Sequence, residues 1–392
     1  MSKAQTYITA AKRSPIGRFL GGLSKLPAPA IGAQVVKAML DEVRADRAAI
    51  GEVYIGQVLQ CGVGQNPARQ VALGAGIPDT ISCTTVNKVC GSGLQAVMQA
   101  DLAIRAGEAD VVLAGGIESM SQAPYFVRGM RTGNKFGNVE LVDGMLYDGL
   151  SNVYDNTVMG VLAEETAARA GITRKMQDEW ACQSHQRAAK ADQAGLFAAE
   201  RVPIEVPREK APFNTDETYR ADANYDALAA LKPAFSKDGP VTAGNASAIS
   251  DGAAAVLVCS EKGLARAGGK PMARIVAHAT AGGPPRELFF APIAAVKTVC
   301  AKAGWDLHAV DLFELNEAFA AQVCANLKAL ELGGENVNVH GGAIALGHPI
   351  GASGARVLVT LLHAMKSRGA KKGVAALCLG GGNAVAMAVE AV

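Results

Sequence analysis

Cys90 is the first residue of this sequence whose type and neighbours could do chemistry. It lies in the segment Asn-Lys-Val-Cys-Gly-Ser-Gly (87–93), directly before a helical pattern that begins near Leu94. A cysteine at a helix N-terminus faces the positive end of the helix dipole, which favours the nucleophilic thiolate. The glycines that follow allow a substrate to approach the sulfur. Cys90 is therefore a candidate nucleophile, and the alternative is a buried structural thiol.

A histidine that could activate such a thiol lies near the other end of the chain. His348 stands in the glycine-rich segment 341–351 and is followed by Pro349, which fixes the backbone after it. The pKa of imidazole lies near neutrality, so His348 could act as the general base for a thiol. The alternative is a histidine with a structural role.

Two further segments carry a polar or reactive side chain. Cys378 lies in an apolar run that ends in Gly380 and two more glycines. Such a turn can expose backbone N–H groups as an oxyanion hole, or it can simply be a tight turn beside a buried thiol. Asn316 follows another apolar run. Its amide could orient a water molecule or cap a helix.

These residues need an alternating framework of strands and helices to position them. Strands are predicted at 53–55 and 110–116, with a helical spacing of apolar residues between them, from 94 to 102. The last third repeats this order, with strands predicted at 312–316 and 374–379 on either side of the glycine-rich segment 351–354. The spacing from Gly56 to Cys90 is 34 residues, as is the spacing from Asn316 to Ile350. The pattern predicts an α/β protein built from two related halves.

Residues 121–250 interrupt this pattern. The stretch is richer in charge and polar turns, and it contains a predicted helical segment at about 163–196. An insertion between the strands of a packed scaffold is typical of ligand and oligomer contacts. A buried strand is predicted at 251–258, and residues 261–271 are expected to link the two halves.

Composition excludes several classes of protein. The 392 residues are 49% hydrophobic and 19% charged, as expected for an enzyme with two or three cores. The net charge of +2 and the absence of a basic run predict no nucleic-acid partner. The first ten residues lack the apolar core of a signal peptide, and no apolar run is long enough to span a membrane. The eight scattered cysteines form no C-x-x-C pair, which predicts reduced cytoplasmic thiols and no metal site.

Taken together, the four segments resemble the signatures of the thiolase family, and within it the acetyl-CoA acetyltransferases. The resemblance runs from the segment 13–17 to the last strand, and its longest matches are 316–320 and 341–354. It implies a thiolase-like, duplicated α-β-α-β-α layered fold with an inserted loop domain. The implied N-terminal half is 1–120 plus 251–268, the loop domain is 121–250 and the C-terminal half is 269–392.

The resemblance also implies roles for individual residues. Cys90 matches the nucleophile that becomes acylated, and His348 matches the base that activates it. Cys378 matches the second cysteine, which moves the proton to or from the α-carbon of acetyl-CoA. Asn316 matches the residue that holds a water, and that water and His348 would form one oxyanion hole. The N–H groups of Cys90 and Gly380 would form the other, in a ping-pong mechanism.

Coenzyme A contacts are implied for the inserted domain. Arg220, Phe235 and Ser247 match positions that contact CoA, with Leu150 beside the pantetheine path; a surface charge and a core phenylalanine are the alternatives for the first two. CoA and acetyl-CoA are then substrates, and no permanently bound cofactor is expected. The implied assembly is a cytoplasmic homotetramer, a dimer of dimers, with acyl-CoA as its partner and no membrane contact.

The chain departs from the family pattern at positions that bear on acyl-chain length. Val158 stands where many short-chain thiolases have His, His340 where Asn is usual and Asn383 where Met is common. The stretch 288–292, Leu-Phe-Phe-Ala-Pro, replaces smaller residues. Its two phenylalanines could both narrow the acyl pocket, which would give a preference for acetoacetyl-CoA, or they could face the core or a subunit interface.

Three alternatives remain open at this point. One is a longer-chain degradative 3-ketoacyl-CoA thiolase. A second is a ketoacyl synthase, but such enzymes pair Cys with two His, or with His and Asn, and lack the second catalytic Cys. The third, a non-catalytic CoA-binding scaffold, would be expected to lose Cys90, His348 or Cys378, and all three are present.

Overall fold

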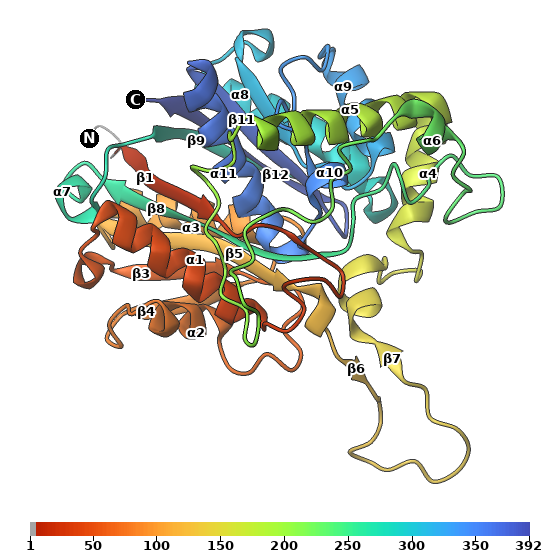
Figure 1. Ribbon diagram of the computed structural model, residues 1–392, viewed down its shortest axis with the longest axis horizontal. Coiled ribbons are helices and arrows are strands. Elements are labelled where there is room, and N and C mark those ends of the chain that lie inside the picture. The colour runs from red at the N-terminus through yellow and green to blue at the C-terminus, as the bar shows by residue number, and fades with distance from the viewer. Residues whose placement is uncertain (1–4) are drawn as a thin grey trace.

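The computed structural model describes residues 5–392 and contains, within that range, one ten-stranded sheet and one two-stranded sheet (Figure 1). The large sheet has the order β10-β11-β12-β9-β1-β8-β5-β3-β4, and β2 pairs with β8. Its strands are β1 (Thr6–Arg13), β2 (Gly17–Arg18), β3 (Glu52–Gly56), β4 (Ser82–Val86), β5 (Val111–Ser119), β8 (Ser250–Ser260), β9 (Ala273–Gly282), β10 (Leu312–Leu315), β11 (Lys372–Leu379) and β12 (Asn383–Ala391). Residues 1–4, which begin the N-terminal segment where no signal peptide is expected, lie outside the described residues.

The chain forms two halves of the same topology, as the repeated sequence pattern predicts. They meet where β1 and β9 pair antiparallel. Each half contains one pair of equivalent parallel strands: β3 pairs with β5 in the N-terminal half, and β10 pairs with β11 in the C-terminal half. The strand β4 on the far side of β3 has its counterpart in a parallel bridge between Phe313 and Val337. The corresponding helices are α1 (Ala28–Val43) and α8 (Ala291–Ala303), α2 (Pro67–Gly74) and α9 (Ala320–Leu330), and α3 (Ser92–Ala106) and α11 (Ile350–Arg368).

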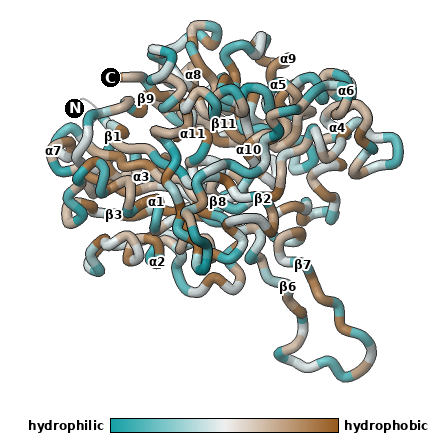
Figure 2. Tube along the Cα trace, viewed as in Figure 1, coloured by the Kyte–Doolittle hydropathy of each residue, from teal (hydrophilic) through white to brown (hydrophobic). Residues whose placement is uncertain are grey.

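The halves stack as helix, sheet, helix, sheet, helix, which confirms the predicted layered fold. Helices α3 and α11 lie between the two halves of the sheet and share one apolar core with strands of both halves. A second core lies between the N-terminal half of the sheet and the outer helices α1 and α2. A third lies under α8 and α9. Figure 2 shows the strands as mostly apolar and the peripheral loops as mostly polar.

Glycines allow α3 and α11 to approach each other closely at their N-terminal ends. A Cβ atom on Gly93 would lie 2.7 Å from the backbone nitrogen of Ala355, and one on Gly354 would lie 2.3 Å from that of Leu94. Larger residues at either position would force the helices apart. The residues that precede the two helices, Cys90 and His348, are therefore brought to the same end of the central layer.

The stretch between β5 and β8 contributes no strand to the ten-stranded sheet. The hairpin of β6 (Tyr125–Phe126) and β7 (Val142–Asp143) extends away from the rest of the molecule (Figure 1). After a turn at Leu146–Leu150 come α4 (Met159–Ala170), α5 (Arg174–Gln193) and α6 (Tyr225–Ala229). The single helical segment predicted at 163–196 is wrong: it is two helices, because Gly171 adopts a left-handed conformation (φ 65°) and ends α4. The expected link 261–271 contains the short helix α7 (Leu264–Ala267), and α10 (Ala343–Leu346) precedes His348.

Candidate active site

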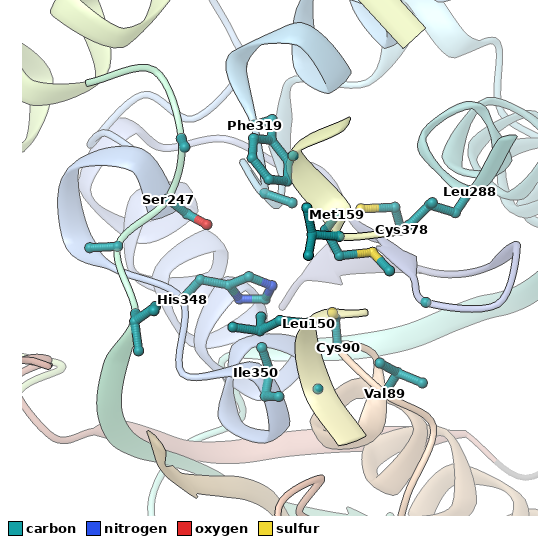
Figure 3. A pocket seen from close by; sticks show the side chains of 18 of the residues that line it. Val89, Cys90, Leu150, Met159, Ser247, Leu288, Phe319, His348, Ile350 and Cys378 are labelled. Carbon is teal, nitrogen blue, oxygen red and sulfur yellow. The ribbon is translucent and has the colours of Figure 1, made fainter. Parts of the chain in front are cut away.

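A cavity of about 590 Å³ opens at the N-terminal ends of α3 and α11. Cys90, Cys378 and His348 face it from three different segments, and Figure 3 shows their sulfur and nitrogen atoms around one space. Most of the remaining wall is apolar: Val89, Met120, Leu146, Leu150, Val158, Met159, Phe235, Ile249, Leu288, Phe289, Phe319 and Ile350. The structure therefore brings together three of the residues selected from the sequence.

A strained turn presents the Cys90 sulfur to the cavity. Val89 has a left-handed backbone (φ 47°), which is unusual for a β-branched residue. Its N–H donates to the Asn87 side chain (3.0 Å), and its carbonyl accepts from the Ser92 hydroxyl (2.6 Å). The Ser92 hydroxyl in turn accepts from the N–H of Lys88 (2.8 Å). These hydrogen bonds hold the turn in its strained form, so the sulfur keeps one position.

The surroundings of Cys90 oppose the thiolate that its position before a helix favours. Burial raises the pKa of the Cys90 thiol to about 11, and the Glu118 carboxylate acts in the same direction. The N–H groups of Gly380 and of Cys90 itself lie against the sulfur and oppose this rise. Helix α3 begins at Ser92, two residues after Cys90, and the apolar wall outweighs the helix dipole. The thiol is protonated at rest and needs a base.

His348 has the tautomer that such a base requires. The Ser353 hydroxyl donates its one hydrogen to the carbonyl of Pro349 (2.9 Å), so it must accept from Nδ1 of His348, which lies 2.5 Å away. The imidazole proton is then on Nδ1, and Nε2 carries the free lone pair. Burial, together with the positive charge of Arg356, lowers the pKa of His348 to about 3. His348 is therefore neutral and able to accept a proton.

Asn316 lies directly behind His348. Its side chain is fully buried, and its Nδ2 is 3.4 Å from Nε2 of His348. It does not cap a helix, since α9 begins at Ala320 after Phe319. Asn316 is not among the residues that line the cavity. The structure thus pairs it with the imidazole, and the water-holding role remains a prediction.

Cys378 reaches the cavity from β11, just before its hairpin with β12. The side chain is 1% exposed, and burial together with the neighbouring Cys90 raises the pKa of its thiol well above the ordinary value. Gly381 and Gly382 have positive φ angles (81° and 88°) and form the hairpin turn. Gly380 lines the cavity, with its N–H directed at the Cys90 sulfur. The turn therefore supplies both a thiol and a backbone donor.

Three of the four residues expected to contact CoA line the same cavity. Leu150, Phe235 and Ser247 do so, and Phe235 packs edge-on against Phe319 with ring centroids 6.1 Å apart. Arg220 does not line it; the side chain is exposed, and its backbone N–H donates to His185. The contacts of all four with CoA remain predictions.

The residues that depart from the family pattern divide into two groups. Val158, Leu288 and Phe289 line the cavity, as expected for residues that shape an acyl pocket. Phe290 is absent from the cavity wall and lies under the guanidinium of Arg169, 5.6 Å from the ring centroid. The expectation that both phenylalanines narrow the pocket is therefore wrong for Phe290, because successive residues of this 3₁₀ turn (Pro285–Phe290) point in different directions.

The other two departures lie away from the cavity wall. His340 packs edge-on against Phe197, with ring centroids 6.1 Å apart. Asn383 begins β12 and pairs with Gly282 of β9. Neither residue is among those that line the cavity, so neither bears directly on its width.

Sequence reasoning missed Ser353, Glu118 and the methionines of the cavity wall. Ser353 lies in a segment in which only the glycines were interpreted. Its position five residues after His348, at the start of a helix, was a usable signal. The buried Glu118 carboxylate accepts N–H groups from Val58 and from Gly351 at the start of α11. Burial raises its pKa to about 7. No local pattern in the sequence indicates that contact.

Residues 5–392 contain neither a candidate metal cluster nor a helix suited to a membrane. No group of three or more His, Cys, Asp or Glu side chains in that range could hold a metal ion. Among the helices of the same range, none is long and apolar enough to cross a membrane.

Comparison with family descriptions matches the chain in two adjoining parts. Residues 6–262 match the description "Thiolase, N-terminal domain", and residues 269–391 match "Thiolase, C-terminal domain". Together these matches cover nearly the whole chain.

Individual relatives of similar length agree with this match. The chain is 53% identical over 389 residues to an acetyl-CoA acetyltransferase of Chromobacterium violaceum, covering 98% of this chain and 99% of the relative. It is 50% identical to the enzyme of the same name from Cupriavidus necator, covering 98% of each. Among solved structures, the Bacillus anthracis acetyl-CoA acetyltransferase superposes with a TM-score of 0.96 at 42% identity, and human mitochondrial 3-ketoacyl-CoA thiolase with 0.97 at 39%, each over all of both chains.

Proposed function

Because this chain belongs to the thiolase family, we propose that it is an acetyl-CoA C-acetyltransferase, which joins two molecules of acetyl-CoA into acetoacetyl-CoA and CoA and also runs the reverse thiolysis. Thiolases act on CoA thioesters. The observation that carries the proposal is one apolar cavity that holds two thiols and a neutral imidazole, with an asparagine behind the imidazole. The names of the most similar relatives support acetyl-CoA as the substrate.

The first half-reaction transfers an acetyl group to Cys90. His348 accepts the Cys90 proton at Nε2, and the thiolate attacks the carbonyl carbon of acetyl-CoA. The N–H groups of Cys90 and Gly380, which lie against the sulfur, are placed to stabilise the oxyanion that forms there. When the tetrahedral intermediate collapses, the carbon–sulfur bond to CoA breaks, and the departing CoA thiolate takes the proton from His348.

The second half-reaction forms the carbon–carbon bond. Cys378 gives its proton to His348 and then takes a proton from the methyl carbon of a second acetyl-CoA. His348 and a water held by Asn316 stabilise the resulting enolate oxygen. The enolate carbon attacks the acetyl group on Cys90, acetoacetyl-CoA leaves, and the Cys90 thiolate recovers its proton from His348. Both thiols and the imidazole are then neutral again, which agrees with their shifted pKa values.

A longer-chain 3-ketoacyl-CoA thiolase is the second candidate, since one such human enzyme superposes on the whole chain. Leu288, Phe289 and Phe319 favour the short-chain assignment, because they fill the wall of the cavity with bulky side chains. The predicted homotetramer, the cytoplasmic location and the absence of a resident cofactor remain predictions that follow from the resemblance.

The test combines labelling with a substrate series. Incubation with acetyl-CoA should add one acetyl group, which digestion and mass spectrometry should locate on Cys90, and Cys90→Ala should remain unlabelled. Thiolysis of acetoacetyl-CoA should exceed thiolysis of 3-ketohexanoyl-CoA at least about tenfold in kcat/KM. Label on Cys378 instead would reverse the roles of the two thiols. Equal rates for the C4 and C8 substrates would favour the longer-chain enzyme.

A further inference from the structure

A buried arginine on α11 lies behind the Asn316–His348 pair. Arg356 is 0% exposed, and its Nη2 is 3.4 Å from the side-chain oxygen of Asn316. It lies three residues after Ser353, the hydrogen-bond partner of His348, so both side chains project from nearly the same face of the helix. One turn of α11 therefore contacts both members of the pair.

The guanidinium decides which way the Asn316 amide points. An arginine side chain has only donors, so the oxygen of the amide must face Arg356. The NH₂ group must then face the opposite side, where Nε2 of His348 lies 3.4 Å away. No other contact selects this orientation, because Asn316 makes no other side-chain hydrogen bond among the described residues.

Glu314 is the nearest counter-charge to Arg356. Its Oε2 is 3.8 Å from Nη1 of Arg356, and it lies in β10, two residues before Asn316, which directly follows that strand. Both of its carboxylate oxygens are buried without a hydrogen-bond partner, as are Nε and Nη1 of Arg356. Such an incompletely paired buried charge is costly to fold, and that cost needs a functional reason or a structural one.

The surrounding charges leave Arg356 as a net positive group beside the site. Burial raises the pKa of Glu314 to about 8, with Arg356 opposing the rise, so at neutral pH this carboxyl is only a partial counter-charge to Arg356. The other charged groups that act on Glu314 or Arg356 are Arg13, Arg187, Glu200 and Glu317. A guanidinium stays protonated in proteins. Its charge therefore favours an anion near Asn316 and opposes protonation of His348.

We propose that Arg356 is a positioning residue for the Asn316–His348 pair, with Glu314 as its counter-charge, so that formation of the enolate and of the carbon–carbon bond depends on this buried arginine. The inference rests on the proposed function. Acetylation of Cys90 also needs His348 as its base, but its oxyanion is held by the backbone donors of Cys90 and Gly380 and not by Asn316, so it depends on Arg356 less.

The test separates the two half-reactions in Arg356→Met. Exchange of the acetyl-CoA methyl protons for deuterium, and condensation, should fall at least roughly 30-fold, since loss of a direct oxyanion-hole donor lowers rates by about 10²–10³-fold. Acetylation of Cys90 should change by less than about threefold, within the effect expected of a surface change. The matched control is Arg105→Met, which removes a half-buried arginine of α3 that pairs with Asp101 and lies outside the cavity wall. It should leave both steps unchanged.

A double-mutant cycle distinguishes positioning from a general loss of structure. In the Asn316→Ala background, Arg356→Met should reduce exchange by less than about a further threefold, because the two residues act as one unit. If the losses of exchange rate in the two single variants multiply in the double variant, the proposal is overturned. An equal fall of acetylation and exchange in Arg356→Met would also overturn it.

A conservative variant covers the case in which Arg356→Met does not fold. Arg356→Lys keeps the charge and a donor but loses the planar fork, so its exchange rate should lie between those of the unmodified enzyme and Asn316→Ala, with acetylation retained. Exchange equal to that of the unmodified enzyme in both variants would also refute the role. Failure of the unmodified enzyme to acetylate Cys90 would refute the proposed function itself, which is a separate outcome.

Discussion

Cys90 and His348 occupy equivalent positions in the two halves of the molecule. Each lies two residues before the first residue of a central helix, α3 or α11, and each follows a residue with a positive φ angle. In the N-terminal half that residue is Val89 (φ 47°), and in the C-terminal half it is Gly347 (φ 98°). The repeated turn thus presents the proposed nucleophile in one half and its proposed base in the other.

The two turns differ in how they are held. Val89 is strained, and the hydrogen bonds to Asn87 and Ser92 compensate for that strain. The backbone of Gly347 (φ 98°, ψ 164°) lies in a region open essentially to glycine alone. Beside it, His348 is 7% exposed, whereas Cys90 is half-buried at the cavity wall. One repeated scaffold therefore gives a reachable sulfur on one side and an enclosed, oriented imidazole on the other.

Cys378 comes from the C-terminal half. Of the substitutions considered, removal of its thiol should lower the reaction rate most. In Cys378→Ser the hydroxyl is a far weaker acid than the thiol, so condensation and thiolysis should slow by roughly 10²–10⁴-fold. Acetylation of Cys90 should persist, because it uses His348 and the backbone donors. Mass spectrometry after acetyl-CoA treatment and deuterium exchange of the acetyl-CoA methyl group measure the two steps. Undiminished exchange would remove Cys378 from the proton transfer.

The protonation states of Cys90 and His348, the residues that the two turns present, can also be followed with pH. Because burial raises the pKa of Cys90 to about 11, the reactive thiolate is scarce near neutrality. Alkylation of Cys90 by iodoacetamide in the free enzyme should rise about tenfold per pH unit from pH 7 to 9, or about 10²-fold over that range. Since the pKa of His348 is lowered to about 3, this profile should show no inflection near 6.5. A plateau reached below pH 9 would mean that Cys90 is an activated thiol with a lowered pKa.

A matched pair of substitutions tests whether the turns differ as described. A methyl group on Gly347 would meet Oγ of Ser250 at 2.2 Å as well as strain the backbone, so Gly347→Ala should lower the free energy of unfolding by about 1–3 kcal/mol or more. The resulting shift of His348 should slow turnover by about 10²-fold. In Val89→Ala the backbone at position 89 keeps its left-handed conformation, which L residues can adopt. The effect of this substitution on turnover should therefore stay within about fivefold.

Thermal or denaturant unfolding together with kcat for acetoacetyl-CoA thiolysis measures both variants. Similar losses in Gly347→Ala and Val89→Ala would show that the two turns tolerate side chains equally. The difference described above between a glycine-only position and a strained one would then be wrong.

The fold and the main candidate residues of the site could be predicted from the sequence, because both depend on local signals. Glycine-rich segments beside Cys90, His348 and Cys378 mark turns, and the repeated strand–helix order marks the two halves. The equivalence by spacing was two residues off, since it paired Cys90 with Ile350 when the structure pairs Cys90 with His348. The pKa of Cys90 could not be predicted, because it depends on the apolar wall contributed by distant segments. The contacts of Arg356 and Glu118 likewise join elements far apart in the chain.

The smallest expected effect concerns the segments that precede the first outer helix of each half. Before α1, Leu23 and Leu26 are buried in the outer core of the N-terminal half. Before α8, the corresponding segment directs Leu288 and Phe289 to the substrate cavity, while Phe290 lies under Arg169. This segment therefore reaches the cavity in one half only, and within that half through only some side chains of a single turn.

Leu288→Ala and Phe290→Ala separate these side chains. Truncating Leu288 enlarges the cavity by about three methylene-sized groups, and filling a pocket by one methylene changes specificity by about 10–200-fold. Since the neighbouring Phe289 stays in place, we expect the preference for acetoacetyl-CoA over 3-ketohexanoyl-CoA to fall only to about a tenth of its value. Phe290→Ala is the matched control and should leave the ratio of kcat/KM values unchanged, whatever it does to stability. If Phe290→Ala relaxes the preference and Leu288→Ala does not, the cavity wall is assigned to the wrong face of the turn.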